Sequence, residues 1–345
     1  MRCILLIMGI LITTAATAET YKVGAAVAVI ANVEVTPIKG GRRNVFPGLL
    51  CNIVKSKGTL LLVEHGAEDL PDIQFWIDKS KVLPYQKAAD YLTDKIKAEP
   101  NNAQWRYGRA LVLTFGDEEE DYDTAIADFT ELIRRKPKTL ACYKGRAAVW
   151  SFMGKLDKVI QDRTAVVKLD PKSPASFKQR GLAWSAKGEQ DKAINDYNEA
   201  IRLNPKYRGA YHHRALEWRG KREYGKALDD YRMAIRLDRL HPGNAFIHAK
   251  IATILATCPD AKHRNGKLAL RHAIKGCEQT GWRSSYLLST LAAAHAEIGN
   301  FEEAIRRQAL AIKIVANEKF AERSLVEYHK MLIRLYRQGK PRRTP

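Results

Sequence analysis

One stretch of twenty residues carries the side chains best suited to metal or redox chemistry. The segment CPDAKHRNGKLALRHAIKGC, residues 258–277, has a cysteine at each end and two histidines between them. In order, Cys258, His263, His272 and Cys277 offer two thiolates and two imidazoles, a ligand set found in structural zinc sites. In an exported chain the two cysteines could instead form a disulfide. Which of these is possible depends on the elements that position the four residues.

The composition excludes a disordered polymer and suggests the kind of partner. The chain has 345 residues, 46% of them hydrophobic, so it can bury a substantial core. Its formal net charge is +20, and from residue 262 to the end there are 17 Lys and Arg against 7 Asp and Glu. A basic surface attracts acidic peptides, nucleic acid, anionic lipid or acidic polysaccharide.

The first twenty residues, MRCILLIMGILITTAATAET, predict a secretory leader. One Arg precedes a short apolar run, which is followed by the small residues Ala16 and Ala18 around Thr17. The apolar run is too short to span a bilayer, which takes about 20 residues. We therefore expect a signal peptide over residues 1–18, cleavage after Ala18, and an exported protein that is periplasmic or associated with the envelope.

The middle of the chain repeats with a period of 34 residues. Segments 140–173, 174–207 and 208–241 align without gaps, which places Trp150, Trp184 and Trp218 at one repeat position and Arg146, Arg180 and Arg214 at another. Each segment is predicted to form two helices. In 174–207, Pro174 fits the first turn of a helix, Gly188 ends that helix, and the second helix stops before Pro205.

The same segment indicates how its helices pack. The small residues Gly181, Ala193 and Ala200 allow a close approach of the two helices. The aromatic residues Phe177, Trp184 and Tyr197 are expected to fill the space between the helices and toward the next unit.

This residue set resembles the tetratricopeptide repeat (TPR), and residues 174–207 match its pattern at every consensus position. The resemblance implies a mainly α fold, a TPR helical-hairpin superhelix preceded by a small SH3-like β-barrel. The expected parts after the barrel are an adaptor helix (86–102), four TPR units (103–139, 140–173, 174–207, 208–241), an elongated TPR-like hairpin (243–282), a C-terminal TPR unit (285–318), and a cap helix with a basic tail (320–345). The C-terminal run from ATCPDAKHRNGKLAL to QGKP resembles a module of exported TPR proteins of planctomycete-type bacteria.

The hairpin prediction answers the question of the two cysteines. Cys258 falls at the turn between two antiparallel helices, and Cys277 falls at the far end of the second helix, roughly 20 Å away at 1.5 Å per residue. A disulfide needs Cα atoms within about 7 Å of each other. His272 and Cys277 also point in different directions around one helix, so four ligands cannot meet at one metal ion. We expect no metal, no cofactor and a structural role for both cysteines.

Residues 19–85 have a different pattern, with short β-rich runs such as GLLCNIV and TLLLVEH separated by Gly-rich turns. The order FPGLLCNIVKSKGTLLLV followed by WIDKSKVLP resembles a bacterial SH3-like domain. That resemblance implies a barrel that binds peptides or the cell wall.

No nucleophile elbow, zinc-protease, phosphate-loop or dinucleotide motif is present, so no catalytic residue is proposed. The TPR resemblance implies a non-enzymatic scaffold or adaptor that binds a protein or peptide, possibly acidic, on the concave wall made by the first helices. The residues expected on that wall are Lys144, Ser151, Lys178, Gln179, Leu182, Ser185, His212, His213, Leu216 and Arg219. The alternative is a binder of anionic polymer, nucleic acid or acidic polysaccharide, that works by charge alone. Nucleic acid is the less favoured of these because the leader directs the chain out of the cytoplasm.

Overall fold

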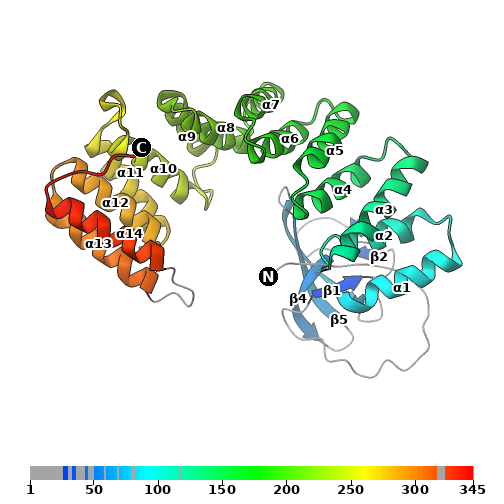
Figure 1. Cartoon of the computed structure of the whole chain (residues 1–345). Helices are drawn as coiled ribbons and strands as arrows, with labels where there is room; N and C mark the ends of the chain where they lie inside the picture. Colours follow the sequence, from blue (N-terminus) through cyan, green and yellow to red (C-terminus); the bar gives the residue numbers. More distant parts are fainter. Residues whose placement is uncertain are drawn as a thin grey trace. The chain divides into compact units, whose positions relative to one another are not determined.

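The computed structural model describes the backbone of seven strands between residues 26 and 84, and then residues 85–116, 118–316 and 323–344. The predicted leader, residues 1–18, lies outside the described residues. The chain forms two compact units, Met1–Pro171 and Lys172–Pro345. Helices dominate both units, so the fold is mainly α, in agreement with the sequence (Figure 1).

The strands of the first unit form two antiparallel sheets. The larger sheet has the order β6-β5-β4-β1-β7, and Val27 of β1 lies between Cys51 of β4 and Pro84 of β7. The smaller sheet pairs β2 with β3. The strands are β1 (Ala26–Val29), β2 (Val33–Val35), β3 (Arg43–Val45), β4 (Leu50–Lys57), β5 (Leu60–Ala67), β6 (Leu70–Asp78) and β7 (Val82–Pro84). They lie within residues 19–85, and their identity as an SH3-like barrel stays a prediction.

Five helices follow the strands in the first unit. They are α1 (Tyr85–Ala98), α2 (Ala103–Leu113), α3 (Glu119–Arg135), α4 (Leu140–Phe152) and α5 (Leu156–Leu169). Helix α1 contacts both β1 and β7 at one end of this series and α2 at the other. The helices after α1 form two hairpins, α2 with α3 and α4 with α5, within the predicted units 103–139 and 140–173.

The second unit continues with helical hairpins. Its helices are α6 (Pro174–Ala186), α7 (Gln190–Leu203), α8 (Arg208–Gly220), α9 (Tyr224–Leu237), α10 (Asn244–Thr257), α11 (Gly266–Gln279), α12 (Ser285–Glu297), α13 (Phe301–Ala316) and α14 (Arg323–Arg337). Helices α6 with α7, α8 with α9, α10 with α11 and α12 with α13 pack as pairs, and α14 covers α13 (Figure 1). We call the first member of each pair, from α2 to α12, a first helix.

The hairpin of α6 and α7 shows how local sequence sets this geometry. The Ser173 hydroxyl caps α6 by accepting a hydrogen bond from the Ser176 amide at 3.3 Å, and Pro174 occupies the first turn. Gly188 ends the helix with φ of +84°, a conformation that glycine adopts without steric cost. A Cβ on Gly181 would lie 2.7 Å from the ring of Tyr197, which is fully buried. Only glycine therefore allows the helices their observed separation.

The role expected for Trp184 needs correction. The sequence places this residue in the core between the helices, but its side chain is only half-buried. The Lys192 ammonium, from the first turn of α7, lies 4.6 Å from the Trp184 ring centroid, and Lys226 covers Trp218 in the same way at 4.5 Å. The ring therefore packs at the hairpin turn beside solvent, and the fully buried Tyr197 fills the space between the helices instead.

A buried ion pair joins the two helices of each of the first four hairpins. An arginine on the first helix makes two parallel hydrogen bonds, 2.7–2.9 Å long, to an aspartate of the second helix. The aspartates are 2–6% exposed. The pairs are Arg109–Asp128, Arg146–Asp162, Arg180–Asp196 and Arg214–Asp230.

Three of these arginines also reach the preceding second helix. The Nη1 group of Arg146 donates to Thr130 at 2.8 Å, and that of Arg214 donates to Asn198 at 2.6 Å. Arg109 makes the equivalent bond to Thr93 of α1 at 3.1 Å. Helix α1 therefore stands to α2 as the second helix of a hairpin stands to the next hairpin, which fits its predicted role as an adaptor.

The C-terminal segment is fixed in place rather than free. Leu332 and Tyr336 of α14 are buried against α12 and α13. Beyond α14, the Thr344 amide donates to the Thr257 carbonyl at 2.8 Å, and Arg343 forms an ion pair of 2.6 Å with Glu297. Part of the predicted basic tail is therefore used inside the fold.

We predict that Arg180→Ala destabilises the protein by about 3–5 kcal/mol, because it leaves the Asp196 carboxylate buried without its partner. Urea unfolding followed by circular dichroism measures the loss. Arg202→Ala is the matched control, since Arg202 pairs with Glu199 at the exposed surface of α7, and it should leave the unfolding free energy nearly unchanged. Equal effects of the two substitutions would show that the Arg180–Asp196 pair does not hold the hairpin together.

Candidate functional site

The residues expected on the concave wall all lie on first helices. Lys144 and Ser151 are exposed on α4 of the first unit. The other eight lie on α6 and α8 of the second unit, where all are half-buried: Lys178, Gln179, Leu182, Ser185, His212, His213, Leu216 and Arg219. Half-burial of polar side chains on neighbouring helices is what a binding surface requires, because such groups are oriented by packing yet still reachable.

Glu217 is a buried acid within this surface that the sequence reasoning missed. It is 7% exposed, and the Ser185 hydroxyl donates to its Oε1 at 2.5 Å, which links α8 to α6. The repeat contained a signal for this residue. The equivalent positions one and two periods earlier hold Ala183 and Val149, both buried, so a glutamate there had to be buried as well.

His212 and His213 contact each other and two different tyrosines. Their ring centroids are 5.1 Å apart; His213 stacks on Tyr197 at 5.9 Å, and His212 lies 6.3 Å from Tyr231. Burial, followed by nearby positive charges, lowers the pKa of each histidine to about 4. Both imidazoles are therefore neutral at pH 7, and each can donate one N–H and accept one hydrogen bond.

The positive charges near these histidines come from three helices. Arg208 of α8 and Lys250 of α10 contribute to the lowered pKa of His212, and Lys178 of α6 with Arg208 contributes to that of His213. Lys250 was not among the predicted residues. It falls 34 residues after Leu216, and its Nζ lies 5.3 Å from the ring centroid of Tyr286 on α12. The same face therefore extends from α6 to α12 within the second unit.

The four residues of the cysteine and histidine motif have separate surroundings. Cys258 ends α10, while Cys277 is near the end of α11; both are free thiols and fully buried. His263 packs against Tyr224 at a centroid distance of 5.9 Å. No group of three or more metal-ligating residues occurs among the described residues.

His272 has a partner that the motif did not reveal. Its Nδ1 lies 2.8 Å from Nδ1 of His248 on α10, so one ring donates and the other accepts. Burial lowers the pKa of both to about 4. This contact joins α10 to α11 and gives His272 a structural role.

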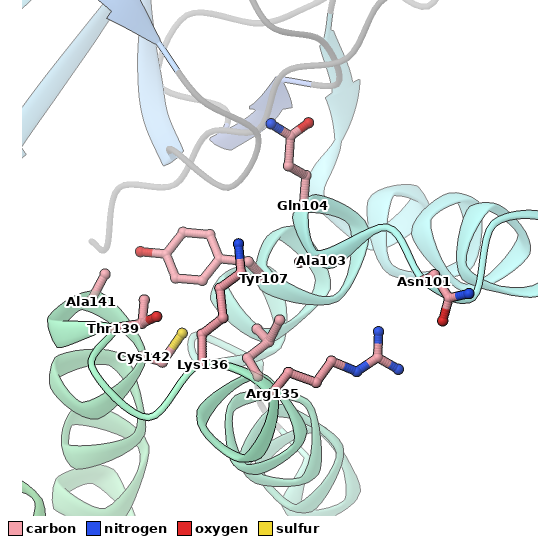
Figure 2. Close-up of a pocket in the computed structure, with 10 residues that line it drawn as sticks. Asn101, Ala103, Gln104, Tyr107, Arg135, Lys136, Thr139, Ala141 and Cys142 are labelled. Atoms are coloured by element: carbon pink, nitrogen blue, oxygen red, sulfur yellow. The ribbon is translucent and has the colours of Figure 1, made fainter.

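The first unit has an apolar pocket of about 520 Å³ formed by α2, α3 and α4. Figure 2 shows Tyr107 and Cys142 turned toward each other across it, with Lys136 at the rim. Burial raises the pKa of the Cys142 thiol to about 11, so this cysteine is not a nucleophile at neutral pH. The lining suits an apolar side chain rather than a reacting group.

Comparison with known families identifies one of these hairpins directly. Residues 179–207 match the model of the tetratricopeptide repeat. The chain carries a tetratricopeptide repeat. The matched segment includes most of α6 and all of α7, and thus Leu182, Ser185 and the Arg180–Asp196 pair. In this TPR the buried ion pair and the candidate surface share the same first helix.

Several solved TPR-type structures are similar at low identity. A MamA fragment from Desulfovibrio magneticus is 20% identical over 45% of this chain and 86% of its own, with a TM-score of 0.41. YrrB, described as a TPR protein with an unusual peptide-binding site, is 18% identical over 59% of this chain and 97% of its own, with a TM-score of 0.45. Yeast Tom70 is 14% identical over 74% of this chain and 59% of its own, with a TM-score of 0.46. No curated protein matches the chain.

In the part of the chain that the structure describes, none of the helices combines the length and apolar character needed to span a membrane.

We predict that the protein loses stability as the pH falls from about 6.5 toward 4. Four histidines, His212, His213, His248 and His272, have a pKa of about 4 in the folded state, below the ordinary 6.5. Below pH 6.5 the unfolded chain therefore binds more protons, so their contribution is full above pH 6.5 and declines toward pH 4. Urea midpoints at pH 7.5, 6.5, 5.5 and 4.5 measure the decline.

The control for this prediction is the double variant His248→Gln with His272→Gln. It should be less stable at pH 7.5 but should lose less stability between pH 6.5 and 4.5, because two of the four titrating groups are gone. A decline as steep as in the wild type would show that the α10–α11 histidines do not titrate on unfolding.

Proposed function

We propose that this protein is a non-enzymatic scaffold that binds a protein or peptide partner on its first helices. The observation that supports this most directly is the face of α6 and α8, where half-buried Lys178, Leu182 and His213 combine positive charge, apolar area and hydrogen-bonding groups. The TPR at residues 179–207 is consistent with it, because stacked helical hairpins present extended binding surfaces.

The proposal includes export and an envelope location. The leader at residues 1–18 supports it, and the β-rich segment 19–85 then supplies an SH3-like domain for contact with peptides or cell wall. Mass spectrometry of the native protein should find Glu19 at the N-terminus. Recovery of the intact chain, beginning at Met1, from the cytoplasm would contradict the export proposal.

The alternative function, binding an anionic polymer through charge alone, is favoured by the formal net charge of +20. Two features make it weaker. The basic side chain of Arg343 is paired with Glu297, and the surface cations of α6 and α8 stand among buried aromatic rings rather than on an open lysine-rich face. Binding that depends on defined residues, and not on total charge, separates the two functions.

We predict that a photo-crosslinking residue at Leu182 captures a defined partner in cells, whereas the same residue at Asn195 does not. Leu182 is half-buried on the first helix α6, while Asn195 is exposed on the second helix α7 of the same hairpin. Adding Lys178→Glu should abolish the Leu182 crosslink, since the reversed charge repels an acidic partner. The crosslinked band on a denaturing gel, identified by mass spectrometry, is the readout.

Lys144→Glu serves as the corresponding variant on α4 of the first unit, and its effect shows whether that unit contributes. Circular dichroism should show unchanged helix content for each exposed substitution. Crosslinks that form equally from Leu182 and Asn195, or that survive Lys178→Glu unchanged, would contradict binding on the first helices.

A further inference from the structure

Arg208, the first residue of α8, differs from the other arginines of the first helices. Its Nη2 donates to the amide oxygen of Asn244 on α10 at 3.0 Å. Its Nε is buried and has no hydrogen-bond acceptor among the described residues. Arg180 and Arg214, by contrast, each hold a carboxylate with two bonds. Burial of a guanidinium without a carboxylate is costly, so Arg208 retains donor capacity for an anion.

The charges around Arg208 are mostly of one sign. Lys250 on α10 and His241 in the preceding loop act on His212, and Lys178 on α6 acts on His213. The acids near this face are already engaged. Glu217 accepts from Ser185, Asp196 is held by Arg180, and Asp238 at the end of α9 accepts from the Leu240 amide. The face is therefore positive and lacks a carboxylate that bonds Arg208 within the described chain.

Two buried hydroxyl groups lie behind the histidines. Tyr197 and Tyr231 are fully buried, and neither hydroxyl has a hydrogen-bond partner among the described residues. Their rings pack against His213 and His212, respectively. On the outer side, Phe246 of α10 is 51% exposed, and Tyr286 of α12 is 40% exposed beneath Lys250. Cations, imidazoles and exposed aromatic rings thus meet on one face of α8, α10 and α12.

We propose that this face is an acidic-peptide site, in which Arg208, Lys250 and the His212–His213 pair bind the carboxylates of an Asp- and Glu-rich segment of the partner. The proposal rests on the proposed scaffold function and names the chemistry of its partner. Arg208 supplies the free Nε donor, Lys250 supplies a point charge, and the imidazoles supply N–H groups at neutral pH. Phe246 and Tyr286 flank the carboxylates and contact the apolar parts of the peptide.

The site couples binding to proton uptake. A bound carboxylate stabilises the protonated form of His212 and His213, so it raises their pKa above the value in the free protein. The groups that face them are Lys178 on α6, Tyr197 on α7, Arg208 and Glu217 on α8, Tyr231 on α9, and His241 with Lys250 before and on α10. Since binding takes up protons, affinity should rise as the pH falls from 7.5 to 5.5, where glutamate remains ionised.

The test measures binding of a fluorescein-labelled hexaglutamate peptide to the full chain by fluorescence anisotropy in 150 mM salt. Arg208→Gln and Lys250→Gln should each weaken binding at least tenfold. Arg236→Gln removes the same charge from the exposed surface of α9 and should change affinity less than twofold. Binding should tighten at least threefold between pH 7.5 and 5.5, and this tightening should disappear in His212→Gln with His213→Gln.

Unchanged affinity in both Arg208→Gln and Lys250→Gln would overturn the site, and Lys250→Gln decides the matter should Arg208→Gln fail to fold. An equal loss in Arg236→Gln would also overturn it, since that result means generic charge attraction. Failure of hexaglutamate to bind overturns the acidic-peptide proposal alone. The scaffold proposal is tested separately by the Leu182 crosslink, which requires no particular ligand chemistry.

Discussion

The helical part of this protein depends on a buried arginine–aspartate pair that recurs in four successive hairpins. Each aspartate is almost inaccessible to water, and each arginine satisfies it with two parallel bonds, so neither charge is left without a partner. Because the arginine comes from one helix and the aspartate from the next, the pair fixes how the two helices are rotated against each other. A buried ion pair adds little net stability over apolar packing, but losing one partner is costly. The pair therefore specifies the geometry of the hairpin.

The same arginines join each hairpin to the one before it. Bonds from Arg109, Arg146 and Arg214 to the preceding second helix mean that rotation within one hairpin is communicated to its neighbour. In the second unit this fixed geometry sets the spacing of α6, α8 and α10, and thus the arrangement of His212, His213 and Lys250. Arg208 is informative against this background, since it is an arginine at the start of a first helix that holds an amide and no carboxylate. The structural arginines are saturated, and this one retains a donor.

The motif that looked most like chemistry turned out to be part of the packing. Cys258 and Cys277 occupy opposite ends of a hairpin, and both are fully buried without a partner that would activate them. Burial raises the pKa of both thiols, which keeps them protonated at neutral pH. His272 contacts a histidine from the facing helix and not the cysteines. Residue types suited to metal binding carry no metal chemistry when the elements that hold them point them apart.

The sequence by itself determined the repeat, its helices and their turns. A period of 34 residues, Pro174 in a first turn, and Gly188 after a helix are local signals, and local backbone preferences act on them directly. Arg146, Arg180 and Arg214 were visible as a repeated position, but their role was not, because it depends on aspartates 16 residues away on another helix. Asp162, Asp196 and Asp230 recur with the same period, so the pairing could have been inferred.

Only the tertiary structure decided which of these side chains are buried and what surrounds them. It moved Trp184 to the edge of its hairpin, buried Glu217 under Ser185, and placed Lys250 beside His212. The turn at Arg222 takes φ of +61°, a conformation that the repeat assigns to glycine at Gly188 and that Arg222 adopts because both flanking helices are held by their packing. Contacts between helices that are distant in sequence set burial, and burial sets the pKa of the histidines. No reading of one helix at a time contains that information.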